Sequence, residues 1–83
     1  MFKLSVVTPS GKAYEDSVDS VAAPGLLGGL EVYSGHMALV CALKNGKLRI
    51  RKAGKEQSLT IDSGLLEVNA AHDVLVLADQ IIS

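Results

Sequence analysis

The chain has few aromatic and sulfur-bearing residues. Its 83 residues include one Phe, two Tyr, no Trp and a single Cys. Because nucleic-acid bases stack on aromatic side chains and this chain has few of them, we do not expect a binding platform for single-stranded nucleic acid. One cysteine cannot form an intramolecular disulfide, and the fold must therefore depend on packing, as is usual in a reducing compartment.

The sequence also shows little of the pattern of a membrane span or a cleavable leader, and we expect neither. The N-terminal segment reaches Pro9 before an apolar run of the length that a secretory signal needs. No run approaches the roughly 20 apolar residues of a membrane-spanning helix. Hydrophobic residues nevertheless make up 48% of the chain, which is enough to build the core of one small domain. We therefore expect a single packed domain that does not span a membrane.

Apolar and polar residues alternate over most of the chain, and Gly, Pro and Asn interrupt the alternation at short intervals. This pattern is typical of short β-strands. It predicts an all-β fold, a two-layer β-sandwich of about nine to ten short strands or a flattened barrel of the same strands. We expect strands near residues 2–6, 13–16, 18–23, 30–33, 37–43, 47–51, 57–62, 65–69 and 74–78. Only residues 78–83 could begin a helix.

Two local patterns give sharper expectations. Asn45 and Gly46 are the residue pair that a type I′ hairpin turn prefers, which predicts that the strands on either side of them pair with each other. The run at 37–43 is continuously apolar, which predicts a strand buried on both faces.

The net charge of −1 conceals an uneven distribution. Six of the eight basic residues fall within twelve positions that contain no acid, at Lys44, Lys47, Arg49, Arg51, Lys52 and Lys55. They form either the solvated outer face of a hairpin or a surface for an acidic partner. Nucleic acid is a poorer candidate, because the chain is slightly acidic overall and lacks interleaved aromatic residues.

Candidates for catalysis are scarce. His36, His72 and Cys41 are the only imidazole and thiol groups, and no motif joins them to a nucleophile or to a set of metal ligands. We therefore expect no catalytic residues, no metal and no cofactor, with His36 in a structural or interface role. The glycine-rich segment at 25–29 lacks the Lys-Ser/Thr pair and the helix of a phosphate-binding loop. Its neighbouring leucines, Leu26, Leu27 and Leu30, either join the core or form an exposed contact patch.

Five segments in register resemble the epsilon subunits of F-type ATP synthases, in their N-terminal β-sandwich domain. They are VDSVAAPG at 18–25, GGLEVYSGHMALV at 28–40, ALKNGKLRIRK at 42–52, SGLLEVN at 63–69 and VLVLAD at 74–79. The resemblance implies a ten-stranded sandwich at the foot of the central stalk, comprising residues 1–79. Residues 80–83 are then a short tail at the point where the family's C-terminal helices, its inhibitory arm, would begin. We expect a chain without that arm to couple the rotor without restraining ATP hydrolysis.

The same resemblance implies a function and two interfaces. The protein is expected to be a non-catalytic rotor subunit of the proton-translocating ATP synthase, which docks the gamma subunit onto the membrane c ring and has no small-molecule substrate. It would be peripheral, on the cytoplasmic face of the bacterial plasma membrane or its organellar equivalent. The gamma-facing residues carried over are Thr8, His36, Met37 and Cys41. Those facing the c ring are Leu26, Leu27, Gly28, Gly29, Leu30 and Glu31, with Glu31 as the hypothetical source of a carboxylate that the family has where this chain has Gly29.

The alternatives are a lipoyl- or biotinyl-type carrier domain, or a generic β-sandwich that binds another protein. A carrier domain needs a modified Lys at a hairpin tip between characteristic neighbours. Lys44 and Lys47 flank the expected hairpin turn, but neither has those neighbours.

Overall fold

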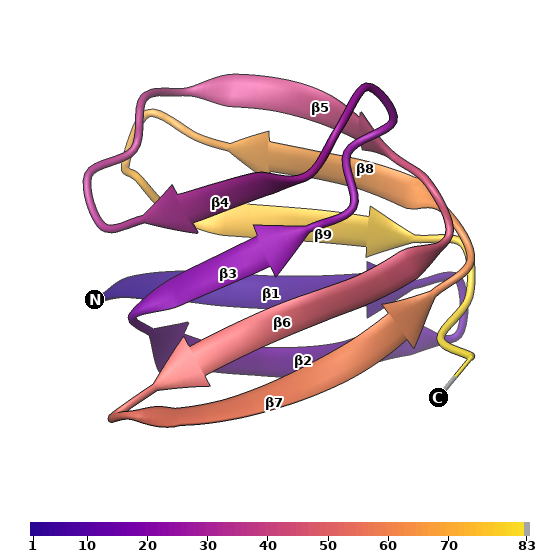
Figure 1. Ribbon diagram of the computed structural model, residues 1–83, viewed down its shortest axis with the longest axis horizontal. Coiled ribbons are helices and arrows are strands. Elements are labelled where there is room, and N and C mark those ends of the chain that lie inside the picture. Colours follow the sequence, from indigo (N-terminus) through magenta and orange to yellow (C-terminus); the bar gives the residue numbers. More distant parts are fainter. Residues whose placement is uncertain (83) are drawn as a thin grey trace.

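The protein is a two-layer β-sandwich in a computed structural model that describes residues 1–82 (Figure 1). Its nine strands confirm the expected all-β class and strand number. They are β1 (Phe2–Thr8), β2 (Gly11–Val18), β3 (Ser20–Ala23), β4 (Leu30–Tyr33), β5 (Leu39–Leu43), β6 (Gly46–Lys52), β7 (Lys55–Ile61), β8 (Gly64–Val68) and β9 (Val74–Ala78).

The strands form a five-stranded sheet in the order β2-β1-β9-β8-β5 and a four-stranded sheet in the order β4-β3-β6-β7. All neighbouring strands are antiparallel except β1 and β9, which run parallel in the middle of the larger sheet. The first and last strands of the chain therefore lie side by side, as Figure 1 shows. This pairing places the two terminal strands inside the larger sheet, with β2 and β5 at its edges.

Aliphatic side chains from the inner faces of both sheets make the core. They alternate with outward residues as the period of two predicts, for example Leu48 and Ile50 inward on β6 with Arg49 outward between them. Core residues on the five-stranded sheet include Leu4, Val6, Leu66 and Val76, all fully buried. Among the described residues, no helix is long and apolar enough to cross a membrane.

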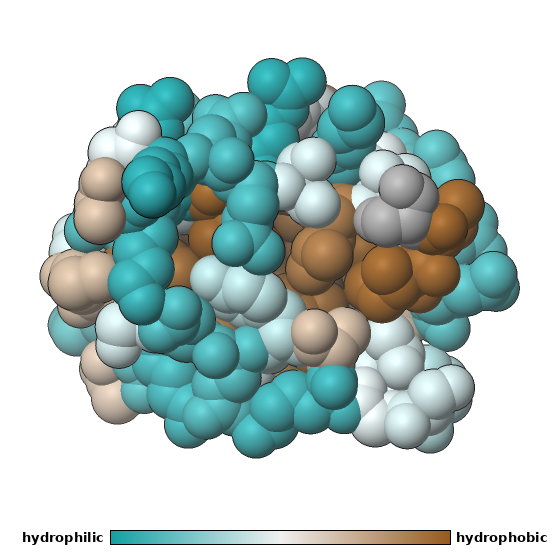
Figure 2. Space-filling model, turned by 90° about the horizontal axis from the view of Figure 1, so that it is seen from below, coloured by the Kyte–Doolittle hydropathy of each residue, from teal (hydrophilic) through white to brown (hydrophobic). Residues whose placement is uncertain are grey.

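The sandwich stays open between its edge strands, and the described residues form no closed barrel. Figure 2 views the molecule from the edge formed by β2 and β7, where apolar residues appear in a band between polar ones. Lys52 of β6 donates a 2.7 Å hydrogen bond to the Asp16 carboxylate of β2 and so ties the two sheets together at this edge. This bond lowers the pKa of Asp16, and it raises the pKa of Lys52.

The prediction of a hairpin at Asn45-Gly46 is wrong. Strand β5, before these residues, pairs with β8, and β6, after them, pairs with β3 and β7, so the chain crosses here from one sheet to the other. Gly46 is needed for a close approach, since a Cβ there would lie 2.8 Å from Cβ of Pro24. The two consecutive positive φ angles of a tight hairpin occur instead at Ala53 (52°) and Gly54 (79°), between β6 and β7.

The prediction of a strand at 37–43 that is buried on both faces is also wrong. Strand β5 begins only at Leu39 and lies at an edge of its sheet, with Val40 and Ala42 exposed on the outer side. Met37 lies before it in a loop, 80% exposed. The helical start considered at the C-terminus does not occur in the described part, where Ile81 forms an isolated antiparallel bridge with Ile61. Ser83, the last residue of the expected tail, lies outside the described residues.

Candidate docking surfaces

An apolar row crosses the outer face of the five-stranded sheet. Val7 of β1 pairs with Leu77 of β9, Leu77 pairs with Leu65 of β8, and Leu65 pairs with Ala42 of β5. Because paired residues point to the same side of a sheet, these four side chains stand together on the face away from the core. Leu65, Leu77 and the neighbouring Val40 are all large apolar residues exposed to solvent. We call this surface the apolar face; its apolar residues are Val7, Val40, Ala42, Leu65, Leu75 and Leu77. One charged residue interrupts it, because the exposed Glu67 of β8 pairs with Val40 on one side and with Leu75 on the other.

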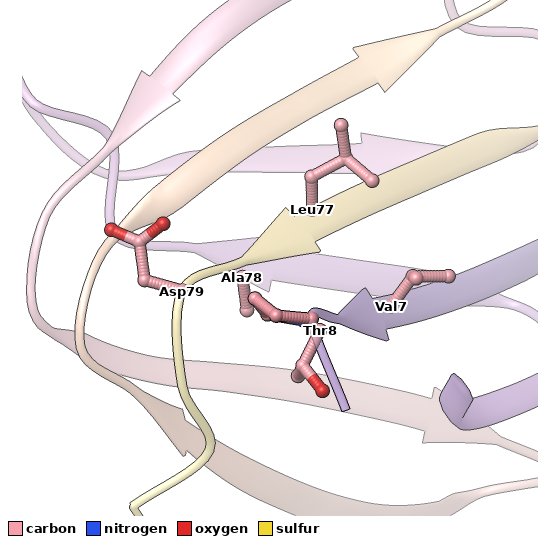
Figure 3. A pocket seen from close by; sticks show the side chains of 6 residues that line it. Val7, Thr8, Leu77, Ala78 and Asp79 are labelled. Atoms are coloured by element: carbon pink, nitrogen blue, oxygen red, sulfur yellow. The ribbon is translucent and has the colours of Figure 1, made fainter. Parts of the chain in front are cut away.

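A hollow of about 250 Å³ lies at one end of the apolar face, where the parallel strands β1 and β9 end. Figure 3 shows Val7 and Leu77 on neighbouring strands at this hollow, with Thr8 and Asp79 at its margin. The Thr8 hydroxyl donates to the Gly11 carbonyl oxygen at 3.1 Å and accepts from the Ser10 amide, so it fixes the turn after β1.

A second hollow, the leucine groove, lies at the other end of the same face. It has a volume of about 340 Å³ and is lined by Leu26, Leu27, Gly28, Leu30, Val40, Cys41 and Ala42. The groove forms because residues 24–26 run antiparallel to the end of β5: the Leu26 amide donates to the Ala42 carbonyl at 2.8 Å, and Gly25 bridges Leu43. Leu26 thus extends the apolar row by one more segment.

The structure decides between the two alternatives left open for the leucines. Leu26 is 59% exposed and Leu27 is 101% exposed, whereas Leu30 is partly buried and packs against the core. The first two form an exposed tip, with Gly28 in a backbone conformation (φ 139°) that glycine tolerates best. The tip is therefore a contact patch whose base is anchored by Leu30.

Glu31 does not lie at this tip. It is an outward residue of β4, on the outer face of the four-stranded sheet, where it pairs with Ala22 of the neighbouring strand β3. A hydrogen bond to the Glu31 carboxylate raises the pKa of the Tyr33 phenol, two residues further along β4. Sequence order placed Glu31 next to the leucines, but the alternation of β4 turns its side chain to the other side of the sandwich from the apolar row.

The outer face of the four-stranded sheet carries the basic residues. Lys47, Arg49 and Arg51 point outward along β6, and only Arg51 is ion-paired there, with Glu56 of β7 at 3.5 Å. Lys52 points inward to the open edge and bonds Asp16. Of the six basic residues clustered in the sequence, Lys47, Arg49 and Arg51 thus form one exposed row, and Lys52 takes part in an ion pair between the sheets.

Chemically, these surfaces present apolar and charged side chains that can bind a partner. Within residues 1–82 no group of three His, Cys, Asp or Glu side chains is placed to hold a metal ion. Cys41 is half-buried and packs against the core. His36 and Met37 occupy the β4–β5 loop, where Nδ1 of His72 lies 3.0 Å from the His36 carbonyl oxygen and links this loop to the β8–β9 turn.

With this geometry in place, comparison with known proteins is decisive. The sequence model of the family described as ATP synthase, Delta/Epsilon chain, beta-sandwich domain matches residues 1–83. The chain belongs to this family. It is 40% identical over 79 residues to the ATP synthase epsilon chain of Chlorobium limicola, covering 94% of this chain and 90% of that one. It is 38% identical over 77 residues to the epsilon chain of Desulforamulus reducens, of which it spans 58%.

Solved structures of ATP synthases contain the same fold. A chain in the structure of the central stalk and c ring of Tetrahymena thermophila mitochondrial ATP synthase superposes with a TM-score of 0.85 at 17% identity, over 99% of this chain and 66% of that one. A chain from the Euglena gracilis mitochondrial enzyme gives a TM-score of 0.90 at 20% identity, over 98% and 52%. At these identities the likeness shows the fold alone. This protein spans 66% of the Tetrahymena chain and 52% of the Euglena chain.

Family membership removes the carrier-domain alternative. The structure agrees, because Lys44 and Lys47 flank a crossover between sheets and not the tip of a hairpin.

The residues expected to face gamma are not brought together at one point of this epsilon-family domain. Thr8 lies at one hollow and Cys41 lines the other, so both border the apolar face. His36 and Met37 lie in the loop that precedes β5, at the opposite end of that strand from the leucine tip. Sequence reasoning missed the apolar face itself. The available signal was that β9 reads Val-Leu-Val-Leu-Ala, apolar at its outward as well as its inward positions.

Proposed function

We propose that this chain is a non-catalytic rotor subunit of an F-type, proton-translocating ATP synthase. It docks the gamma subunit onto the membrane c ring in the central stalk, and so couples ion flow to ATP synthesis. Family membership supports the assignment to the enzyme, and the apolar face supports docking. The site of action is the cytoplasmic face of the bacterial plasma membrane or its organellar equivalent.

The apolar face is the observation that carries this proposal. Its row of apolar side chains runs unbroken across four strands, from Val7 through Leu77 and Leu65 to Ala42, and a small domain rarely leaves such a row on the outer side of a sheet unless another molecule covers it. A stable protein interface buries about 800 Å² on each partner, about a sixth of the 4732 Å² that this chain exposes. We assign the apolar face to gamma, together with Thr8 and Cys41 at its two hollows and with His36 and Met37 in the loop before β5.

The leucine tip is assigned to the c ring, with Leu26, Leu27 and Leu30 as the apolar contacts. Gly28 and Gly29 shape the tip, because Gly28 holds a positive φ and neither glycine adds a side chain that would shield the leucines. Glu31 stays a candidate for a peripheral contact on the adjoining face.

Co-purification tests the proposal. The chain, added to purified gamma and c ring together, should form a complex of all three, and titration calorimetry against gamma alone should give saturable binding. A monodisperse, folded chain that binds neither component would overturn the proposed function.

A further inference from the structure

One carboxylate stands within the apolar face. Glu67 is an exposed, outward residue of β8. It pairs with Val40 of β5 on one side and with Leu75 of β9 on the other. Leu65 precedes it by two positions and therefore points to the same side of the sheet. Glu67 is thus bordered by apolar side chains on both neighbouring strands and along its own strand.

The lysines of the same sheet are engaged elsewhere. Lys3 of β1 and Lys12 of β2 both form ion pairs with Glu15 of β2. Strand β2 is separated from β8 by β1 and β9 in the order of the sheet. Among residues 1–82, none of the ion pairs includes Glu67.

The sequence around Glu67 is poor in cations as well. Residues 56–83 contain five acids and no Lys or Arg. His72, in the turn between β8 and β9, is directed to the loop before β5, because its Nδ1 lies 3.0 Å from the His36 carbonyl oxygen. Within the part of the chain that the structure describes, the Glu67 carboxylate therefore depends on water for its solvation.

Covering the apolar face would remove that water. An ionised carboxylate that is buried without a partner costs far more free energy than one that is paired and hydrogen-bonded. A wholly apolar partner surface would therefore be penalised at Glu67, although it would fit Val40, Leu65 and Leu75. A positively charged group opposite Glu67 would avoid this penalty, because it forms a charge-assisted hydrogen bond from which the surrounding apolar contacts exclude water.

We propose that the partner of the apolar face presents an arginine or lysine side chain opposite Glu67, and that this ion pair fixes the orientation of the partner on the sheet. The inference rests on the proposed function, which makes that partner gamma. Hydrophobic contact is non-directional, so a row of aliphatic side chains alone allows the partner to slide along it. A charge-assisted hydrogen bond has a defined geometry. Glu67 is therefore the specificity-determining residue of this contact.

Titration calorimetry of the complete chain against purified gamma tests the inference. Glu67→Gln keeps the size of the side chain but removes its charge, and it should weaken gamma binding about thirtyfold, because the cation opposite is left covered without its counter-charge. Glu67→Leu should weaken binding to a similar degree, even though it makes the face more apolar. Glu56→Gln is the matched control, since Glu56 is an exposed carboxylate that pairs with Arg51 on the outer face of the other sheet, and it should bind as the wild type does.

Two further measurements identify a covered ion pair. The difference in affinity between the wild type and Glu67→Gln should persist at high salt, because salt screens exposed charges much more than covered ones. Each basic residue on the surface of gamma can be changed to Glu in turn, and one such variant should bind the Glu67→Lys chain better than it binds the wild type. Urea denaturation should give the Glu67 variants the stability of the wild type, since Glu67 forms no ion pair within residues 1–82.

Three results would overturn the inference. Tighter gamma binding by Glu67→Gln or Glu67→Leu would show that the partner surface opposite is apolar. Unchanged binding by both variants would place Glu67 outside the covered area, and so would a difference that vanishes at high salt. In each case saturable binding of gamma by the wild-type chain would leave the proposed function intact, whereas a folded wild-type chain that does not bind gamma would overturn both.

Discussion

Replacing Leu77 by Asp is the sharpest perturbation of the apolar face. Leu77 stands in the middle of the row between Val7 and Leu65 and is 45% exposed in the free chain. Complete burial of a leucine side chain contributes about 1.5–3 kcal/mol, so covering the exposed part by gamma contributes about 1 kcal/mol. Burying an unpaired carboxylate costs at least about 2 kcal/mol more. The total of about 3 kcal/mol predicts binding to gamma about a hundredfold weaker.

The fold should survive this change. Leu77 points away from the core, and its loss removes cross-strand contacts to two neighbours, each contributing about 0.2–1 kcal/mol. Titration calorimetry against purified gamma measures the affinity, and urea denaturation measures the free energy of unfolding. Tyr33→Asp is the matched control, because Tyr33 is 56% exposed on the outer face of the opposite sheet. A folded Leu77→Asp chain that binds gamma within threefold of the wild type would refute the assignment of this face.

Three further predictions concern the stability of the sandwich. Gly64→Ala should lower the free energy of unfolding by about 2–4 kcal/mol in urea denaturation, because its Cβ would overlap the Leu77 carbonyl oxygen on the next strand; an unchanged midpoint would contradict the close packing of β8 on β9. The pKa of Asp16 lies below its ordinary value of 3.8, chiefly because Lys52 donates to it, so this pair stabilises the fold above that pH and the stabilisation is lost as pH falls through the lowered pKa. The Asp16→Asn chain should therefore show a shallower loss of stability on acidification below about pH 4, measured by circular dichroism, and an acid limb parallel to the wild type would count against the ion pair. Ala53→Asn should raise the free energy of unfolding by about 0.5 kcal/mol, because Asn tolerates the positive φ of this turn better than Ala does; lower stability would show that the turn conformation is misassigned.

Local patterns in the sequence were sufficient to predict the strands but not all of their partners. The alternation of Leu48 and Ile50 with basic residues placed β6 correctly, and the strand expected at 30–33 is β4 as observed. Asn45-Gly46 was misleading because turn preference is a contribution of about 1 kcal/mol, which the packing of whole strands overrides. Pairing of β5 with β8 and of β6 with β3 joins residues far apart in the chain, and no local signal encodes that choice.

The candidate site was less accessible to sequence reasoning than the fold. The sequence leaves Leu26 and Leu27 as either core or contact residues, and only the folded structure shows that both are exposed. Leu65 and Leu77 become neighbours through the register of β8 on β9, so the apolar face could not be assembled before that register was known. Glu31 was placed near the leucines by its position in the chain, whereas the two-residue period of β4 directs it elsewhere.

The central claim is that gamma covers the apolar face of this epsilon-family domain. A photo-crosslinking amino acid at position 65, in the assembled ATP synthase, tests it most directly, with the same residue at position 33 as the control. We expect a covalent adduct with gamma from position 65, in the centre of the apolar face, and none from position 33. An adduct with gamma from position 33 alone, or no gamma adduct from position 65 in an assembled enzyme, would contradict it.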